Sequence, residues 1–273
     1  MNVATCPLRN RYYNIPAMAI DLNCDMGESF GAYALGADEA LMPLVTSANI
    51  ACGYHAGDPM VMDRTVRLAL RYGVGIGAHP GFPDLMGFGR RAMHLRPEEI
   101  ENYVLYQVGA LAAFAHAAGA ELTHVKPHGA LYNMAARDPE IARAVARGVA
   151  RAGPRRILVG LANSALIQAA AEVGLPFARE GFADRAYEPN GTLRPRHLPG
   201  AVLTDPERAA EQALQIVREG RVTASNGESI PLVVDTLCIH GDTPGAVEIA
   251  RAVRQHLERA GVDVRPMGKF LGR

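Results

Sequence analysis

Residues 122–133, with the sequence LTHVKPHGALYN, bring together side chains that can exchange protons or bind ions. The alternation predicts a strand, in which the side-chain period of two places His124, Lys126 and His128 on one face. Pro127 predicts that the strand ends there, because proline lacks the N–H that a sheet requires. An ammonium and two imidazoles repel one another when charged, so this face is favourable only opposite an anion or a metal. The competing interpretation is two surface histidines beside a lysine that extends to solvent.

Other strand-like stretches argue for a site, because they end in the same way. Residues 18–25, 73–79 and 233–242 alternate apolar residues with small or polar ones and then run into loops. In a β/α barrel, the active site lies at the carboxyl ends of the strands. The side chains at these ends are Asp21, Asn23, Asp25, Asn49, His55, His79, Lys126, His128, Glu180, Asp184, Arg185, His240 and Asp242.

Two kinds of chemistry fit this set of residues. Imidazole nitrogens with a carboxylate suit zinc or a similar divalent ion. The histidines that we assign to such an ion are His55 and His79, although the chain has no HExxH motif to support them. Without a metal, a carboxylate–histidine pair could activate water. Lys126 and Arg185 could then hold a carboxylate or a phosphate.

The remaining candidates follow from their position at the strand ends. We assign catalysis to Asp25, Lys126, His128, Glu180 and His240. We assign substrate binding to Asn23, Asn49 and Arg185. A nucleophilic Cys24 or Cys52 is the less favoured interpretation, because buried cysteines are usually inert. The sequence contains neither a GxSxG elbow nor a GxxxxGK[ST] phosphate loop, so any nucleotide would need another mode of binding.

Strands and helices alternate along the chain, which predicts parallel βαβ connections. The expected strands cover residues 18–25, 46–52, 73–79, 122–127, 156–162, 176–181 and 233–242. The expected helices cover 38–45, 59–72, 97–118, 139–152, 164–173, 206–219 and 244–260, and four of them open with Asp-Pro or Thr-Pro. An open doubly wound sheet also fits this order, but its strands should be apolar on both faces. The alternating strands therefore favour a barrel with polar residues in its lumen.

Composition limits the classes of partner and compartment. The chain has 273 residues, of which 49% are hydrophobic, and its 28 basic residues balance its 28 acidic ones. The sequence lacks the stripe of basic residues that is typical of nucleic-acid binding. It also lacks an apolar run long enough for a membrane span. The four cysteines form no CxxC pair, which indicates a reducing cytoplasm. We expect residues 1–17 to be a flexible extension and residues 18–273 to form a single barrel domain.

Six stretches together resemble the LamB/YcsF family. They are DLNCDMGESFG (21–31), SANIACGYHAGDP (47–59), GAHPGFPDLMGFGRR (77–91), VKPHGALYN (125–133), EGFADRAY (180–187) and CIHGD (238–242). The third usually has Ser-Tyr where this chain has Gly81-Phe82, a difference that affects at most a loop contact.

The resemblance implies a distorted seven-stranded β/α barrel, similar to that of polysaccharide deacetylases. It implies the ATP-dependent opening of 5-oxoproline (pyroglutamate) to L-glutamate, together with 5-oxoprolinase subunits B and C. ATP would be used with these partners, which phosphorylate the lactam, and this chain would complete the hydrolysis. Two alternatives stay open from the residues alone: a metal-dependent deacetylase acting on a sugar amide, and a non-catalytic subunit that binds substrate for its partners.

Overall fold

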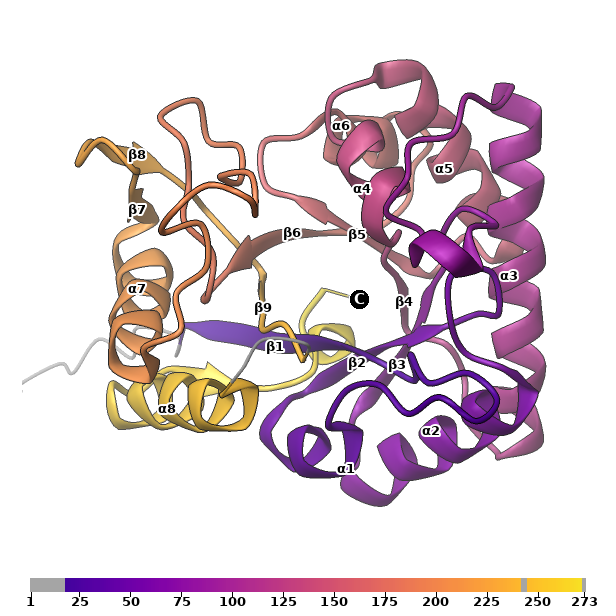
Figure 1. The fold of residues 1–273 in the computed structure, drawn as a ribbon, viewed down its shortest axis with the longest axis horizontal. Helices are drawn as coiled ribbons and strands as arrows, with labels where there is room; N and C mark the ends of the chain where they lie inside the picture. The colour runs from indigo at the N-terminus through magenta and orange to yellow at the C-terminus, as the bar shows by residue number, and fades with distance from the viewer. Residues whose placement is uncertain (1–17, 242–244, 272–273) are drawn as a thin grey trace, which may run out of the picture.

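The computed structural model of the protein describes residues 18–241 and 245–271. Seven parallel strands form a closed barrel in the order β1-β2-β3-β4-β5-β6-β9, and β9 pairs back to β1. The strands are β1 (Ala19–Met26), β2 (Ser47–Ala51), β3 (Gly75–His79), β4 (His124–Val125), β5 (Ile157–Leu161), β6 (Phe177–Phe182) and β9 (Thr236–Cys238). The helices lie outside this ring of strands (Figure 1). The predicted seven-stranded β/α barrel is confirmed. The expected extension at residues 1–17 lies outside the described residues, so that domain boundary stays a prediction.

Eight α-helices and three 3₁₀ turns complete the described fold. The helices are α1 (Asp38–Leu41), α2 (Pro59–Tyr72), α3 (Pro97–Ala117), α4 (Gly129–Ala135), α5 (Pro139–Ala152), α6 (Ala165–Glu172), α7 (Pro206–Glu219) and α8 (Ala246–Arg259). The turns are η1 (Met42–Leu44), η2 (Leu85–Gly87) and η3 (Met267–Lys269). Within the described ranges, no helix is both long and apolar enough to cross a lipid bilayer. The candidate Asp242 and the predicted Thr243-Pro244 start of the last helix lie outside the described residues.

Aspartate caps explain why three helices begin where the sequence predicted. Asp58, Asp138 and Asp205 each accept hydrogen bonds from two backbone N–H groups at the start of α2, α5 and α7. A proline follows each of them, at a position where its missing N–H costs nothing. The caps fix the helix starts, and so fix the length of the loops that reach the barrel mouth.

Replacing one of these caps should lower stability without touching the barrel mouth. Asp205→Ala removes the acceptor for Glu207 N (2.9 Å) and Arg208 N (3.2 Å). We expect the free energy of unfolding to fall by about 1 kcal/mol. Asp205→Asn is the matched control and should stay close to wild type, because asparagine caps equally well. Urea denaturation measures both, and equal losses in the two variants would contradict the capping role.

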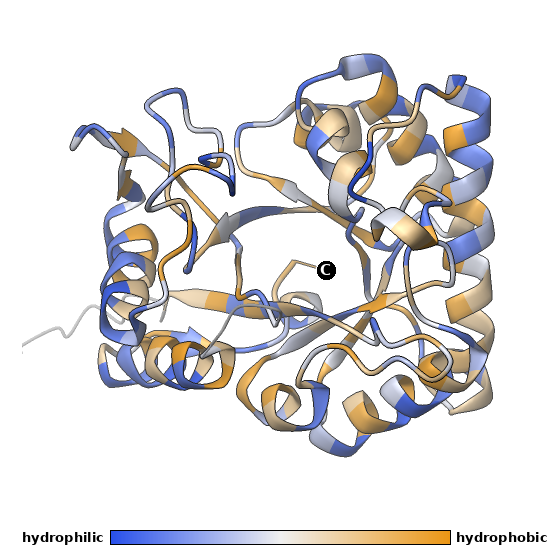
Figure 2. Ribbon diagram, viewed as in Figure 1, coloured by the Kyte–Doolittle hydropathy of each residue, from blue (hydrophilic) through white to orange (hydrophobic). Residues whose placement is uncertain are grey.

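The alternation in β1 separates a polar lumen from an apolar exterior. Ile20 and Leu22 are buried in the main hydrophobic cluster. Asp21 and Asn23, on the other face, are equally buried but hydrogen-bond to polar side chains of neighbouring strands. The outer helices carry both hydrophilic and hydrophobic segments along their length (Figure 2), as expected of helices that cover a barrel. The predicted polar lumen is therefore confirmed.

The structure differs from the predicted strands in residues 122–133. β4 ends at Val125, and His128 is already the N-cap of helix α4, which the sequence did not predict. Beyond Val125 the chain still bonds to the segment that follows β3, from Lys126 N to the Ala78 oxygen (2.9 Å) and from His128 N to the Pro80 oxygen (2.8 Å). Gly129 then begins the helix with a positive φ of 55°. Position 129 requires glycine, because the Cβ of any other residue would lie 2.6 Å from the Gly89 carbonyl oxygen. The predicted common face is therefore confirmed for His124 and Lys126, whose side chains both enter the lumen network, and wrong for His128, which lies at the start of α4.

Two further departures lie at the edges of the barrel. β9 is shorter than the predicted strand 233–242, and β10 (Asp263–Val264), which was not predicted, pairs with the start of β1. The Asn226-Gly227 turn joins a small hairpin of β7 (Arg221–Thr223) and β8 (Ser229–Pro231) outside the barrel. None of these differences moves the strand ends that carry the candidate site.

Candidate functional site

A pocket of about 400 Å³ opens at the carboxyl ends of the barrel strands. Its lining includes six of the predicted site residues, namely Asp25, His79, Lys126, His128, Arg185 and His240. Glu180 and His55 do not line it but lie directly beside lining residues, as described below. Asn23 and Asn49 are deeper, fully buried in the lumen. The predicted residues therefore gather at a single end of the barrel.

Lys126 is the centre of the polar network beneath this pocket. Its Nζ lies 3.0 Å from Asp25 Oδ1 and 2.9 Å from Glu180 Oε1, so β4 is linked across the lumen to β1 and β6. Burial alone would lower the pKa of Lys126, but the charges of Asp25 and its other neighbours raise it well above the usual value. The pKa of Asp25 is likewise held well below its usual value, because His79 and Lys126 outweigh the effect of burial. The site therefore holds a buried ammonium between two carboxylates.

The two asparagines fix this network from below. Asn49 Nδ2 donates to Asn23 Oδ1 (2.8 Å) and to Asp25 Oδ1 (2.9 Å). Lys126 Nζ donates to Asn23 Oδ1 at 3.2 Å. His124 Nε2 lies 2.9 Å from Asn49 Oδ1 and completes the layer. The structure thus places Asn23 and Asn49 under Asp25 and Lys126, outside the pocket lining.

Tyr132 is a site residue that the sequence analysis missed. Its hydroxyl donates to Glu180 Oε2 at 2.6 Å, and the residue lines the pocket. Burial, and then the neighbouring Glu180 carboxylate, raise the pKa of Tyr132 well above its usual value, so the phenol keeps its proton. It lies on α4, the unpredicted helix, and only knowledge of that helix could have placed it. Tyr132 and Lys126 together fix both oxygens of Glu180.

His240 forms a carboxylate–histidine pair with Asp184. His240 Nδ1 lies 2.9 Å from Asp184 Oδ1, and the His240 backbone N–H donates to Oδ2 at 3.1 Å. Burial would raise the pKa of Asp184, but His240 outweighs it and the pKa is lowered. A charged carboxylate facing Nδ1 keeps the ring proton there and leaves Nε2 as the nitrogen that can accept a proton. Asp184 was recognised at a strand end but was not assigned this role.

Three histidines and a glutamate form a second cluster on the β2–β3 side. Glu28, His55, His79 and His128 each present a ligand atom, and these atoms lie within 4.8 Å of one another. Burial lowers the pKa of His128 to about 3 and that of His55 well below its usual value. The two predicted metal histidines are therefore brought together, with His128 beside them. Glu28 was not singled out, since it follows β1 in an irregular segment.

The rim of the pocket is strongly basic. The arginines that line it are Arg90, Arg137, Arg185, Arg194 and Arg196, whereas Asp25 is the single acidic side chain among the described lining residues. Arg185 is buried, and its guanidinium donates to the backbone oxygens of Ala201 (3.1 Å) and Arg194 (2.6 Å). These bonds fix its orientation without neutralising it. The pocket therefore suits a small molecule with one or more negative charges.

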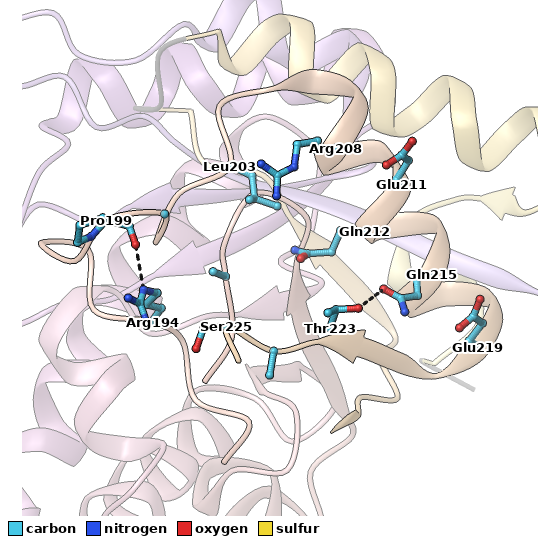
Figure 3. Close-up of a pocket in the computed structure, with 13 residues that line it drawn as sticks. Arg194, Pro199, Leu203, Arg208, Glu211, Gln212, Gln215, Glu219, Thr223 and Ser225 are labelled. Carbon is cyan, nitrogen blue, oxygen red and sulfur yellow. Dashed lines mark hydrogen bonds between the residues drawn. The ribbon is translucent and has the colours of Figure 1, made fainter. Parts of the chain in front are cut away.

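A larger cavity of about 640 Å³ lies elsewhere, between α7 and the loop around Pro199. Figure 3 shows Arg208, Gln212 and Gln215 on one side of it and Arg194 on the other. The buried lysine, the carboxylates and the histidines of the barrel mouth are absent from its described lining. Chemistry, rather than volume, therefore assigns the active site to the smaller pocket.

Comparison with known proteins agrees with the six motifs. The model of the LamB/YcsF family matches residues 20–272. A 5-oxoprolinase subunit from Pyrococcus furiosus is 57% identical over 254 residues, which cover 93% of this chain and 100% of the relative. The protein of the same name from Coprothermobacter proteolyticus is 59% identical over 247 residues, which cover 90% of this chain and 95% of that one.

A solved structure also agrees over nearly the full length. The lactam utilization protein from Thermus thermophilus is 54% identical and superimposes with a TM-score of 0.87. The match covers 91% of this chain and 99% of that one. The chain belongs to the LamB/YcsF family.

Proposed function

We propose that this chain is a subunit of an ATP-dependent 5-oxoprolinase and carries out the hydrolytic opening of 5-oxoproline to L-glutamate. The observation that carries the proposal is the buried Lys126, held between Asp25 and Glu180 on the floor of an arginine-rimmed pocket. The names of its close relatives support the substrate. We further propose that 5-oxoprolinase subunits B and C are its partners, that ATP is used with them, and that the complex works in the cytoplasm.

The residues fit the difficulty of the reaction. A lactam carbonyl is a poor electrophile, and its nitrogen is a poor leaving group. Phosphorylation of the carbonyl oxygen by the partners would relieve the first problem. Within this chain, His240 takes a proton from water while Asp184 holds its ring, and the water oxygen bonds to the lactam carbon. The carbon–nitrogen bond then breaks, and His240 returns the proton to the nitrogen, which becomes the amine. A second water then hydrolyses the resulting acyl phosphate, so that inorganic phosphate leaves and L-glutamate remains.

The charged groups act on the negative charges of the substrate. The Lys126 ammonium stabilises the negative phosphate oxygens of the activated lactam, because it is already oriented and needs no reorganisation. Asn23 and Asn49 position Asp25 and Lys126 from below. Arg185 binds the substrate carboxylate with its fixed guanidinium. Glu180 keeps the ammonium charged and in place.

Replacing Arg185 by lysine should weaken substrate binding more than turnover. Lysine keeps the positive charge but cannot reproduce the planar fork that two carbonyl oxygens hold in place. Losing one charged hydrogen bond of about 1.5 kcal/mol should raise KM roughly tenfold and change kcat much less. Steady-state kinetics of the reconstituted complex measure both constants. An unchanged KM would remove Arg185 from substrate binding.

Reconstitution tests the proposal as a whole. The chain is combined with partner subunits B and C, ATP and 5-oxoproline, and the release of glutamate and phosphate is followed. We expect glutamate only when all three proteins are present. Glutamate production by the two partners without this chain would contradict the proposal, as would its absence from the complete, correctly assembled mixture.

A further inference from the structure

Two histidine nitrogens face each other at the edge of the pocket. His79 Nδ1 lies 2.7 Å from the carbonyl oxygen of Lys126. His128 Nε2 lies 2.8 Å from the carbonyl oxygen of Phe88. Because a carbonyl oxygen only accepts, each of these nitrogens carries its ring's proton. In the neutral rings, His79 Nε2 and His128 Nδ1 are then both lone-pair acceptors, 2.9 Å apart, and they repel unless a cation binds them.

His55 adds a third nitrogen to the same place. The residue is fully buried, and its ring stacks on that of His128 at 3.7 Å with an angle of 2°. Neither of its ring nitrogens has a hydrogen-bond partner among the described residues. A buried polar group left without a partner destabilises the folded protein, so a ligand that binds these nitrogens is favoured. The ring is also confined, since a Cβ at Gly81 would lie 2.8 Å from Nδ1, so the Gly81 difference noted in the sequence falls beside this cluster.

Carboxylate oxygens approach the cluster from the β1 side. Glu28 Oε1 lies 3.6 Å from His128 Nδ1 and 3.7 Å from His55 Nε2. Asp25 Oδ2 lies 3.2 Å from His79 Nε2. Ligand atoms that share one zinc ion, at bond lengths of about 2.0–2.2 Å, are roughly 3–4 Å apart. The ligand atoms are therefore close to the positions that a single ion requires.

We propose that Glu28, His55, His79 and His128 bind one divalent transition-metal ion of the zinc type, beside Asp25 and the catalytic pocket. Three imidazoles and a carboxylate are ligands that such ions prefer, whereas magnesium and calcium prefer oxygen alone. The carbonyl oxygens behind His79 and His128 act as the outer partners that orient metal-binding histidines. Bound there, the ion would supply a polarised water or carbonyl at the pocket wall. That use rests on the proposed function, but the binding does not.

Metal binding is measured on the isolated chain, without substrate or partners. The protein is stripped with a chelator and titrated with Zn²⁺ by calorimetry, and its metal content is measured by elemental analysis. Co²⁺ in place of Zn²⁺ gives a visible absorption spectrum that reports histidine coordination. We expect one ion per chain. Since losing an outer partner costs about 10–100-fold in affinity, His55→Gln and Glu28→Gln, which each remove a direct ligand, should weaken binding by at least about 100-fold.

Matched variants keep the result interpretable. His116→Gln changes an exposed histidine on α3 and should bind zinc like wild type. His240→Gln should also bind zinc normally, since His240 is outside the cluster. If His55→Gln fails to fold, Glu28→Gln decides, because glutamine keeps the shape of the side chain. A wild-type chain that takes up no zinc, or wild-type affinity in the folded cluster variants, would overturn the metal site and make the His79–His128 contact a shared proton.

The two proposals fail separately. A chain that binds no metal while its complex still releases glutamate removes the metal site and leaves the proposed function standing. A chain that binds one zinc ion while the assembled complex forms no glutamate keeps the metal site and removes the proposed function.

Discussion

Lys126→Met should lower glutamate formation by the reconstituted complex by at least about thirtyfold. Methionine keeps the length of the stem and deletes the ammonium. Truncating one partner of a buried charge pair costs on the order of 2–5 kcal/mol, and each 1.36 kcal/mol is tenfold in rate. Part of the loss comes from Asp25 and Glu180, which are left facing each other without the cation between them. Turnover by the three-protein complex measures the effect.

The other lysine of the chain supplies the control. Lys269 lies exposed on η3, away from the described pocket lining, and Lys269→Met should turn over normally. Circular dichroism should show the barrel intact in both variants, because the apolar exterior of β4 is untouched. Normal turnover by a well-folded Lys126→Met variant would exclude a catalytic role and favour the non-catalytic, substrate-binding alternative.

His240→Gln should lower turnover by about 100-fold or more, because general acid–base groups typically contribute 10²–10⁴-fold. Glutamine can still hydrogen-bond to Asp184 but cannot exchange a proton near neutral pH. The pH profile is a second readout: removing the general acid–base group should change how turnover depends on pH. A loss of activity with an unchanged pH profile would indicate a structural role instead.

A histidine on the outside of the barrel gives the matched control for this prediction. His256 on α8 also faces a carboxylate, with Nε2 3.2 Å from Glu207 Oε2, but it lies outside the described pocket lining. His256→Gln should leave both the rate and its pH dependence unchanged. Equal effects of the two substitutions would mean that the loss at His240 does not arise from catalysis.

Local signals explain how much of the fold was predictable. Asp-Pro pairs set the starts of α2, α5 and α7, because capping and the fixed φ of proline act within a few residues. The alternation in residues 18–25 set which face of β1 enters the lumen. In contrast, β10 pairs with β1 from more than 230 residues away along the chain, at Ala19 and Asp263, and no local pattern encodes such a pairing.

The residues of the candidate site were likewise only partly predictable from the sequence. Asp25, Lys126 and His240 were predictable because the ends of parallel strands must meet at one end of a barrel. Glu28 and Tyr132 were not, since a loop and the short helix α4 bring them in. Asp184 was visible as a residue at a strand end, but its pairing with His240 depends on how β6 and β9 lie together. Partnerships between side chains are set by packing, which the sequence pattern does not specify.

If the barrel mouth of this chain performs the ring opening, loss of its buried ammonium must abolish the first turnover. The most direct test is a rapid-quench measurement of the first turnover, with radiolabelled 5-oxoproline, ATP and complexes that contain either wild-type chain or the Lys126→Met variant. We expect glutamate in the first turnover from the wild-type complex and almost none at the same time from the assembled variant complex. Glutamate formed at the wild-type rate by the variant complex would contradict this expectation.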